Sequence, residues 1–186
     1  MEVSRDPQLQ PEQPIQKEEK KQYSSSLFEF VKIIVIAAVI VLPIRYFIFQ
    51  PFIVKGESME PNLQSGDYLI VDEISYRLSD PKRGDVVVLK YPLDMSQRFI
   101  KRVIGLPGET ITIDDGKITV SKSGDVVLLD EKMYLPSVSI TNGERSWTLK
   151  DSEYFVMGDN RQFSYDSRSW GALPRQDIIG KAVFRL

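Results

Sequence analysis

The hydrophobic pattern divides the chain into three parts. Residues 1–26 are polar and have no hydrophobic period, which is typical of a disordered tail. Residues 27–49, LFEFVKIIVIAAVIVLPIRYFIF, would span about 34 Å as a helix, compared with about 30 Å for the core of a bilayer. From residue 50 onward, short hydrophobic runs alternate with turn residues. The pattern therefore predicts a tail, one transmembrane anchor, and a further domain over residues 50–186.

Charge and flanking residues refine the prediction for the anchor. The uncharged run Ile33–Ile44 is only 12 residues long, a length that also suits a buried helix or the core of a cleaved signal peptide. No small-x-small cleavage signal follows before FQPFIVKGES, which favours a retained anchor. Four cations precede the span: Arg5, Lys17, Lys20 and Lys21. They predict a cytoplasmic N-terminus, with everything after Phe49 on the far side of the membrane.

The residues after the anchor are typical of β-strands. The runs are short, rich in β-branched and aromatic residues, and separated by Gly, Pro, Asp and Asn: YLIVDEI, DVVVLKY, FIKRVI, ETITIDDGKITV, VVLLD, EYFVMG and KAVFRL. TITI and KITV flank the turn signal DDG, which predicts a β-hairpin. We therefore expect a mainly β domain, built as a compact, partly closed antiparallel sheet.

Composition excludes several kinds of chemistry. The 186 residues contain no Cys and no His, which excludes a thiol nucleophile, a Ser-His-Asp triad and a His-ligated zinc site. The formal charge of −2 gives no reason to expect a nucleic-acid partner. No phosphate-binding glycine motif is present. If the protein is a hydrolase, its general base must be Lys, Asp, Glu or Tyr.

Lys101 is a candidate for that base. Strand alternation in RFIKRVIG places it on the same face as Phe99 and Val103, among apolar side chains. In one interpretation its ammonium group snorkels to water past an apolar stem. In the other it is buried and uncharged, since burial can lower a lysine pKa by up to about 3–5 units. An unperturbed lysine is neutral only about 0.04% of the time at pH 7.

Two segments could supply its partners. Ser58 lies in VKGESMEP, where a serine beside Gly and Pro could equally be a turn residue. The segment MGDNRQFSYDSRSWG, residues 157–171, could be a structural loop closed by an ion pair between Asp166 and Arg168. It lacks the spacing of an EF-hand calcium site. In the functional interpretation, Ser164 would hydrogen-bond a neutral lysine amine.

Three motifs resemble one family. SMEP at 58–61, KRVIGLPGE at 101–109 and GDNRQFSYDSRSWG at 158–171, behind an N-terminal anchor, are similar to the sequence boxes of bacterial type I signal peptidases. The compact, single-anchor members are the most similar. The resemblance implies a Ser-Lys dyad protease that removes signal peptides after small-x-small sites such as Ala-x-Ala.

The resemblance also implies roles for individual residues. Ser58 corresponds to the nucleophile and Lys101 to the general base. Ser164 corresponds to the serine that orients the lysine, and Asp166 and Arg168 to the pair that supports its loop. Three positions depart from the common pattern: Gly56 in place of a serine, Asn62 in place of Thr, and Glu109 in place of Asp. Because Gly56 has no hydroxyl, the oxyanion hole would rest on backbone N–H groups, at Ser58 and Gly56.

The resemblance implies no cofactor and no metal. Its implied partners are the signal peptides of exported preproteins, the lipid bilayer and the export machinery, and no nucleic acid. The implied location is the plasma membrane, single-pass, with a cytoplasmic N-terminus and an extracytoplasmic catalytic domain; a thylakoid membrane stays open. Two rival hypotheses are a self-cleaving regulatory Ser-Lys protease, which the anchor opposes, and a catalytically silent, membrane-tethered binding protein.

Overall fold

The computed structural model describes residues 19–47, 49–136 and 141–185. It divides into two units, residues 1–42 and residues 43–186. The prediction that the domain after the anchor is mainly β and antiparallel is confirmed.

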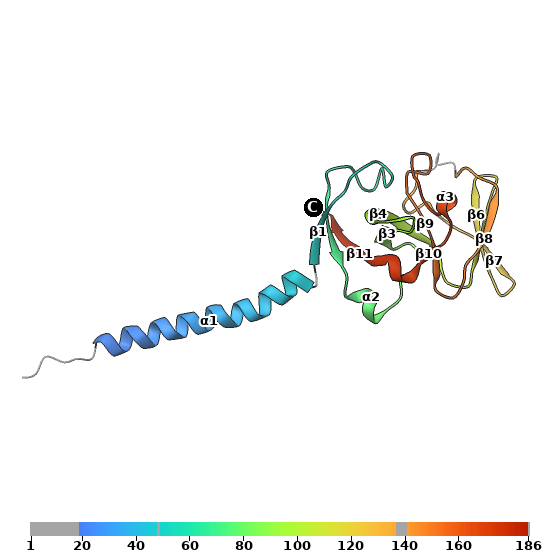
Figure 1. Ribbon diagram of the computed structural model, residues 1–186. Helices are drawn as coiled ribbons and strands as arrows, with labels where there is room; N and C mark the ends of the chain where they lie inside the picture. The colour runs from blue at the N-terminus through green and yellow to red at the C-terminus, as the bar shows by residue number, and fades with distance from the viewer. Residues whose placement is uncertain (1–18, 48, 137–140, 186) are drawn as a thin grey trace, which may run out of the picture. The chain divides into compact units, whose positions relative to one another are not determined.

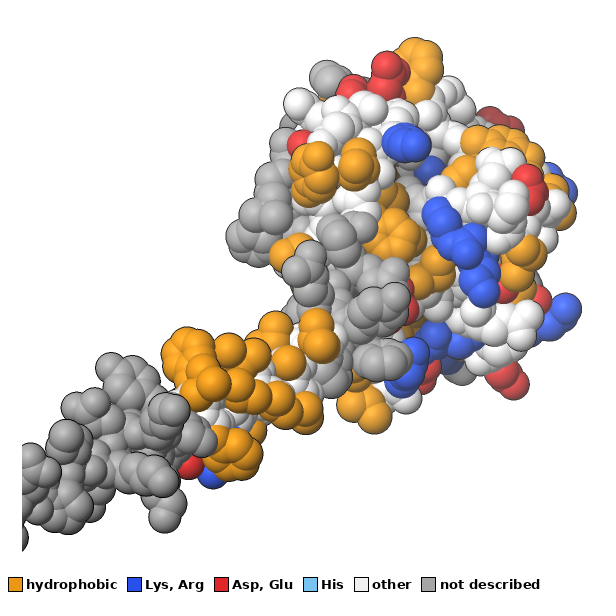
Figure 2. Space-filling model, turned by 60° about the vertical axis from the view of Figure 1, so that its left-hand side comes forward, with side chains coloured by type: hydrophobic (Ala, Val, Ile, Leu, Met, Phe, Trp, Pro, Cys, Tyr) orange, Lys and Arg blue, Asp and Glu red, His pale blue; other side chains and the backbone are white. Residues whose placement is uncertain are grey.

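Helix α1 (Glu19–Phe47) begins earlier than the sequence predicts. Residues 19–26, expected to be disordered, belong to it, whereas residues 1–18 of the predicted tail lie outside the described residues. Figure 2 shows hydrophobic side chains along the described part of this helix, and those from Leu27 to Leu42 are largely exposed. Among the described helices, none combines the length and the hydropathy needed to cross a membrane. The anchor over 27–49 therefore stays a prediction.

Two antiparallel sheets form the second unit (Figure 1). In spatial order the larger sheet contains β1 (Phe49–Ile53), β2 (Tyr68–Asp72), β11 (Ile178–Arg185), β3 (Val86–Tyr91), β4 (Asp94–Gly105), β9 (Glu153–Met157) and β10 (Leu173–Pro174). The smaller sheet contains β7 (Asp125–Leu128), β6 (Lys117–Lys122), β5 (Thr110–Asp114) and β8 (Arg145–Thr148). Three short helices connect strands: α2 (Ser75–Leu78), α3 (Ser167–Trp170) and the 3₁₀ helix η1 (Arg175–Asp177).

The expectation of one partly closed sheet is wrong, because neither sheet closes. The strands between β4 and β9 pair with one another rather than with the larger sheet, and so they form a sheet of their own. Gly105 ends β4 at this point, where a Cβ atom would lie 2.7 Å from the Ile111 side chain. The absence of a side chain there lets β5 pack closely against the end of β4.

The predicted hairpin is confirmed. β5 and β6 pair in antiparallel register, with Ile113 opposite Ile118. Asp115 and Gly116 connect them with positive φ angles of 45° and 72°. Two consecutive residues of this kind are typical of a type I′ turn, for which Asp-Gly is a preferred sequence.

Strand β4 runs through the interior of the larger sheet, between β3 and β9 (Figure 1). Lys101 lies opposite Val87 of β3, on the face where Val103 is also buried. The prediction that Lys101 points with the apolar side chains is therefore confirmed. This face packs into a core cluster that also contains Leu89 and Val156.

Candidate active site

Ser58 lies in a turn that follows β1. The next residue, Met59, is 1% exposed and packs into a core cluster with Val54 and Leu69, which fixes one side of the turn. Asn160 fixes the other side, since its backbone N–H donates to Ser58 O at 3.0 Å. Its side-chain amide donates to Glu57 O at 3.1 Å. The serine is therefore held between the hydrophobic core and the loop after β9.

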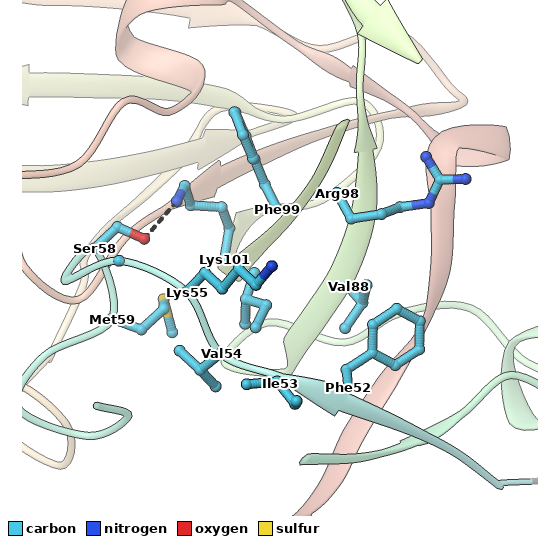
Figure 3. Close-up of a pocket in the computed structure, with 12 residues that line it drawn as sticks. Phe52, Ile53, Val54, Lys55, Ser58, Met59, Val88, Arg98, Phe99 and Lys101 are labelled. Carbon is cyan, nitrogen blue, oxygen red and sulfur yellow. Dashed lines mark hydrogen bonds between the residues drawn. The ribbon is translucent and has the colours of Figure 1, made fainter. Parts of the chain in front are cut away.

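The structure brings Ser58 and Lys101 into contact, although they are 43 residues apart in the sequence. Lys101 Nζ and Ser58 Oγ are 2.7 Å apart, as the dashed line in Figure 3 marks. Lys101 is only 3% exposed. The snorkelling interpretation of this lysine is wrong, because its amine ends inside the protein beside the serine hydroxyl.

Burial changes the acidity of this lysine. Desolvation lowers the pKa of Lys101 from 10.5 to about 8, the positive charge of Arg168 adds to this lowering, and the carboxylates of Asp166 and Asp159 act against it. The ring centroid of Phe99 lies 5.3 Å from Nζ, so an apolar ring occupies part of the space where water would solvate an ammonium group. Desolvation prevails because no carboxylate forms an ion pair with Lys101 within the described residues.

Arginines hold both carboxylates that act on Lys101. Arg168 contacts Asp166 at 2.8 and 2.9 Å, and the backbone N–H of Gly158 donates to the same carboxylate at 3.0 Å. Arg102 contacts Asp159 at 2.7 and 2.6 Å. Each negative charge is thus already balanced by an arginine, which weakens its pull on the lysine.

The Asp166–Arg168 pair forms as the sequence predicts, but Ser164 differs from the expectation. Ser164 Oγ is buried and has no hydrogen-bond partner among the described residues, so the predicted hydrogen bond to Lys101 is not formed. Ser164 still lies beside the nucleophile. A Cβ atom on Gly158 would lie 2.2 Å from Ser164 Oγ and 2.3 Å from Ser58 O, so all three residues meet at one point. Its orienting role stays a prediction.

The two backbone N–H groups predicted for the oxyanion hole differ in their hydrogen bonding. The N–H of Gly56 donates to Ser65 Oγ at 3.4 Å, a long hydrogen bond. The N–H of Ser58 donates to no acceptor within the described part of the chain. Of the two, only the Ser58 N–H is without a protein acceptor among the described residues, and the assignment of both to the oxyanion hole stays a prediction.

A cavity of about 180 Å³ adjoins the Ser58 hydroxyl and the Lys101 amine (Figure 3). Its walls come from the end of β1 with the Ser58 turn, and from β3 and β4: Phe52, Ile53, Val54, Lys55, Gly56, Ser58, Met59, Val88, Arg98, Phe99, Ile100 and Lys101. The serine and lysine therefore face a small, mostly apolar space that can receive part of a ligand.

Three contributions to the site were not found from the sequence. Asn160 hydrogen-bonds to the Ser58 turn, and Gly158, which has no side chain, allows the loop after β9 to lie close to Ser58 O. Arg161 is 3% exposed and stabilises the loop after β9 through Glu131, at 2.6 and 2.8 Å, and through Thr141 at 2.8 Å. The only sequence signal was the density of polar residues directly after a buried strand, because partners 20–30 residues away leave no local pattern.

Comparisons with known proteins agree on one family. The family model described as "Signal peptidase, peptidase S26" matches residues 27–186. A protein named signal peptidase I from Leptolyngbya laminosa is 39% identical over 96% of this chain and 88% of its own length. A signal peptidase I from Bacillus licheniformis is 36% identical over 86% of this chain and 88% of its own length.

A solved structure of a signal peptidase I from Enterococcus faecalis overlaps in part. It is 28% identical, covers 56% of this chain and 98% of its own, and has a TM-score of 0.47. The family assignment does not depend on that overlap, because the family model and the relatives cover most of the chain. On their evidence, the chain belongs to the signal peptidases of the peptidase S26 family, which are hydrolases.

Proposed function

We propose that this chain removes signal peptides from exported preproteins, with Ser58 as the nucleophile and Lys101 as the general base. The observation that carries the proposal is the 2.7 Å contact between Ser58 Oγ and the buried Nζ of Lys101. A serine hydroxyl is a weak nucleophile by itself and needs an adjacent base. With no histidine in the sequence, the lysine amine is the basic group in contact with it.

The pKa of Lys101 supports its role as a base. With a pKa of about 8, roughly a tenth of the lysine is neutral at pH 7, compared with about 0.04% for an unperturbed lysine. The population able to accept a proton is therefore about 200-fold larger. A base with a pKa near the working pH combines the correct protonation state with sufficient basicity.

The chemical steps follow from this arrangement. Neutral Lys101 Nζ takes the hydroxyl proton while Ser58 Oγ attacks the substrate carbonyl. The tetrahedral oxyanion then accepts a hydrogen bond from the Ser58 backbone N–H. The lysine then donates its proton to the leaving amine as the peptide bond breaks. In the second stage the lysine accepts a proton from water, the resulting hydroxide attacks the acyl-enzyme, and the proton returns to Ser58.

The size of the cavity supports small substrate side chains beside the cleaved bond. A volume of about 180 Å³ is smaller than the roughly 300–1,000 Å³ of sites that enclose drug-sized ligands. Such a space accommodates Ala-sized residues better than large ones. We therefore propose cleavage after small-x-small sequences of the Ala-x-Ala type.

Membrane attachment through residues 27–49 is part of the proposal. The exposed apolar side chains from Leu27 to Leu42 support it, since such a surface is unfavourable in water. Ser58 follows Phe49 by nine residues, at most about 30 Å of extended chain, which would hold the site near the membrane on the extracytoplasmic side. Retention of the full chain in the membrane pellet after alkaline carbonate extraction would support attachment, and release into the supernatant would contradict it.

Cleavage of a presequence substrate tests the function directly. Wild-type chain in detergent should release the signal peptide, while Ser58→Ala and Lys101→Ala should lose this activity. Binding of the preprotein without cleavage by the wild type would favour a silent binding protein. Dominant cleavage of the chain itself would favour a self-processing protease.

A further inference from the structure

The cavity beside Ser58 and Lys101 has two more cations in its wall. Lys55 and Arg98 line it, and both side chains are exposed. No Asp or Glu is among the described residues that line this cavity. All the charged groups in its wall are therefore positive.

Arg98 lies away from the reacting atoms (Figure 3). Arg98 precedes Lys101 by three residues on β4, so the two Cα atoms are about 10 Å apart at a rise of about 3.3 Å per residue. Lys55, two residues after the end of β1, lines the same cavity. Figure 3 shows Ser58 and Lys101 at one end of the cavity, and Arg98 at the other with its guanidinium pointing away from them. A peptide bound across Ser58 would pass these cations a few residues from its cleaved bond.

Neither cation has an acidic ion-pair partner among the described residues. The guanidinium of Arg98 donates to backbone carbonyls, at Met95 (2.6 Å) and Gln97 (3.4 Å). Lys90 lies directly opposite Arg98 in the β3–β4 register, so this end of the cavity carries an additional positive charge.

The cavity that adjoins the Arg98 end is polar. Arg98 and Lys90 line an adjoining cavity of about 320 Å³, together with Gln176 and one carboxylate, Glu73. The charge of Lys90 also acts on the buried carboxyl group of Asp177. Among the cations that line the cavity beside Ser58, Lys55 and Arg98 are the exposed ones, whereas Lys101 is buried.

We infer that Lys55 and Arg98 select the charge of the substrate: an acidic side chain about four or five residues before the cleaved bond, or about three to five after it, favours cleavage, and a basic one disfavours it. This inference rests on the proposed peptidase function. An exposed ion pair changes an equilibrium constant by about two- to fivefold, so the two cations together should give a preference of about 4- to 25-fold. Exposed charges are screened by salt, so the preference should shrink strongly at 1 M ionic strength.

A substrate panel tests the inference on the full chain in an uncharged detergent. Peptides with the same small-x-small site carry Glu, Gln or Lys at the fourth or fifth residue before the cut, or at the third to fifth residue after it. Wild type should show the highest kcat/KM for Glu and the lowest for Lys, mainly through KM. The double variant Lys55→Glu/Arg98→Glu should reverse this order. The matched variant Lys82→Glu/Lys117→Glu changes the charge equally at exposed positions outside both cavities and should keep the wild-type order.

The other outcomes overturn the inference in distinguishable ways. If wild type cuts all three peptides equally well, or if the double reversal keeps the order, charge selection is wrong while the peptidase function stands. If wild type cuts none of them, the proposed function fails and the inference fails with it. If the double reversal keeps the peptide order but loses binding to anionic lipid vesicles, the cations bind lipid headgroups instead.

Discussion

Two buried cations near the candidate site behave in opposite ways. Lys101 and Arg161 are each 3% exposed. Lys101 contacts a serine hydroxyl, and burial lowers its pKa. Arg161 contacts both carboxylate oxygens of Glu131, and this pairing raises the pKa of the arginine despite the same burial. Burial alone therefore does not decide whether a cation can lose its proton; the position of the nearest unbalanced carboxylate does.

The carboxylates around Lys101 explain why it stays unpaired. Asp166 is held by Arg168 and Asp159 by Arg102, so neither is free to form an ion pair with the lysine. The loop after β9 thus contributes two things to the site. It packs Ser164 and Gly158 against the Ser58 turn, and its acidic groups are already neutralised.

A lysine of this kind destabilises the folded state at neutral pH. Between about pH 8 and 10.5 the unfolded chain binds a proton at Lys101 that the folded chain does not, so stability rises with pH in this window. Below pH 8 the full cost applies, about 3 kcal/mol for a pKa lowered from 10.5 to about 8. Arg161 has no such cost, because its charge is paired.

The largest expected effect is on activity. Lys101→Met removes the base and should lower kcat/KM by about 10²–10⁴-fold, the contribution that a general base typically makes. Measurement of presequence cleavage at pH 8 checks this. Ser58→Ala, which removes the nucleophile, is the matched control. Retention of activity within tenfold of wild type would make Lys101 a structural residue.

Arg161→Met should have the next largest effect, on stability. It leaves Glu131 without its charge partner and Thr141 without its donor, and breaking a buried pair in this way costs about 3–5 kcal/mol. Denaturant unfolding followed by tryptophan fluorescence measures the change. A loss below about 1 kcal/mol would mean that the pair is solvated in solution and that the comparison with Lys101 does not hold.

Lys101→Met should raise the free energy of unfolding, in contrast to Arg161→Met. At pH 7 it removes a desolvation cost of about 3 kcal/mol and loses one hydrogen bond worth about 1 kcal/mol, so the net gain should be about 2 kcal/mol. The gain should disappear by about pH 10.5, where the lysine is neutral in the folded state and about half neutral in the unfolded chain. Unfolding curves of wild type and variant at pH 7 and pH 10.5 check it. A gain that is the same at both pH values would point to packing rather than to charge.

Arg168→Gln should have the smallest effect, a shift of the pH profile. The substitution removes a positive charge that lowers the pKa of Lys101 and frees the Asp166 carboxylate that raises it. The alkaline rise of kcat/KM should move up by about one pH unit, which is about a tenfold loss at pH 7 and little loss at pH 10. Lys82→Gln, an exposed cation outside the site, should not move the profile. An equal loss at every pH would indicate a purely structural role.

Local patterns predicted much of the fold and the core of the site. Strand alternation placed Lys101 on the buried face, and the turn residues Asp115 and Gly116 predicted the β5–β6 hairpin. The separate smaller sheet was missed, because strand pairing between distant segments leaves no mark in local alternation. The start of β1 at Phe49 was missed because the hydrophobic run of the predicted anchor continues into that strand.

The polar contacts were harder to predict than the apolar ones. The Asp166–Arg168 pair is two residues apart and was predicted, whereas the pairs Arg102–Asp159 and Arg161–Glu131 join residues 57 and 30 positions apart and were not. The hydrogen bond expected between Ser164 and Lys101 is not formed, since side-chain orientation depends on packing around Gly158 that a sequence does not display.

The protonation of Lys101 can be measured directly. NMR titration of the full chain with ¹³Cε-labelled lysine in detergent micelles, with Lys101→Met to assign the resonance, gives the pKa of this amine. We predict a midpoint near pH 8 for Lys101, well below its ordinary value of 10.5. A midpoint at about 10.4, the value of an unperturbed lysine, would contradict it, because the amine would then be charged at neutral pH and unable to activate Ser58.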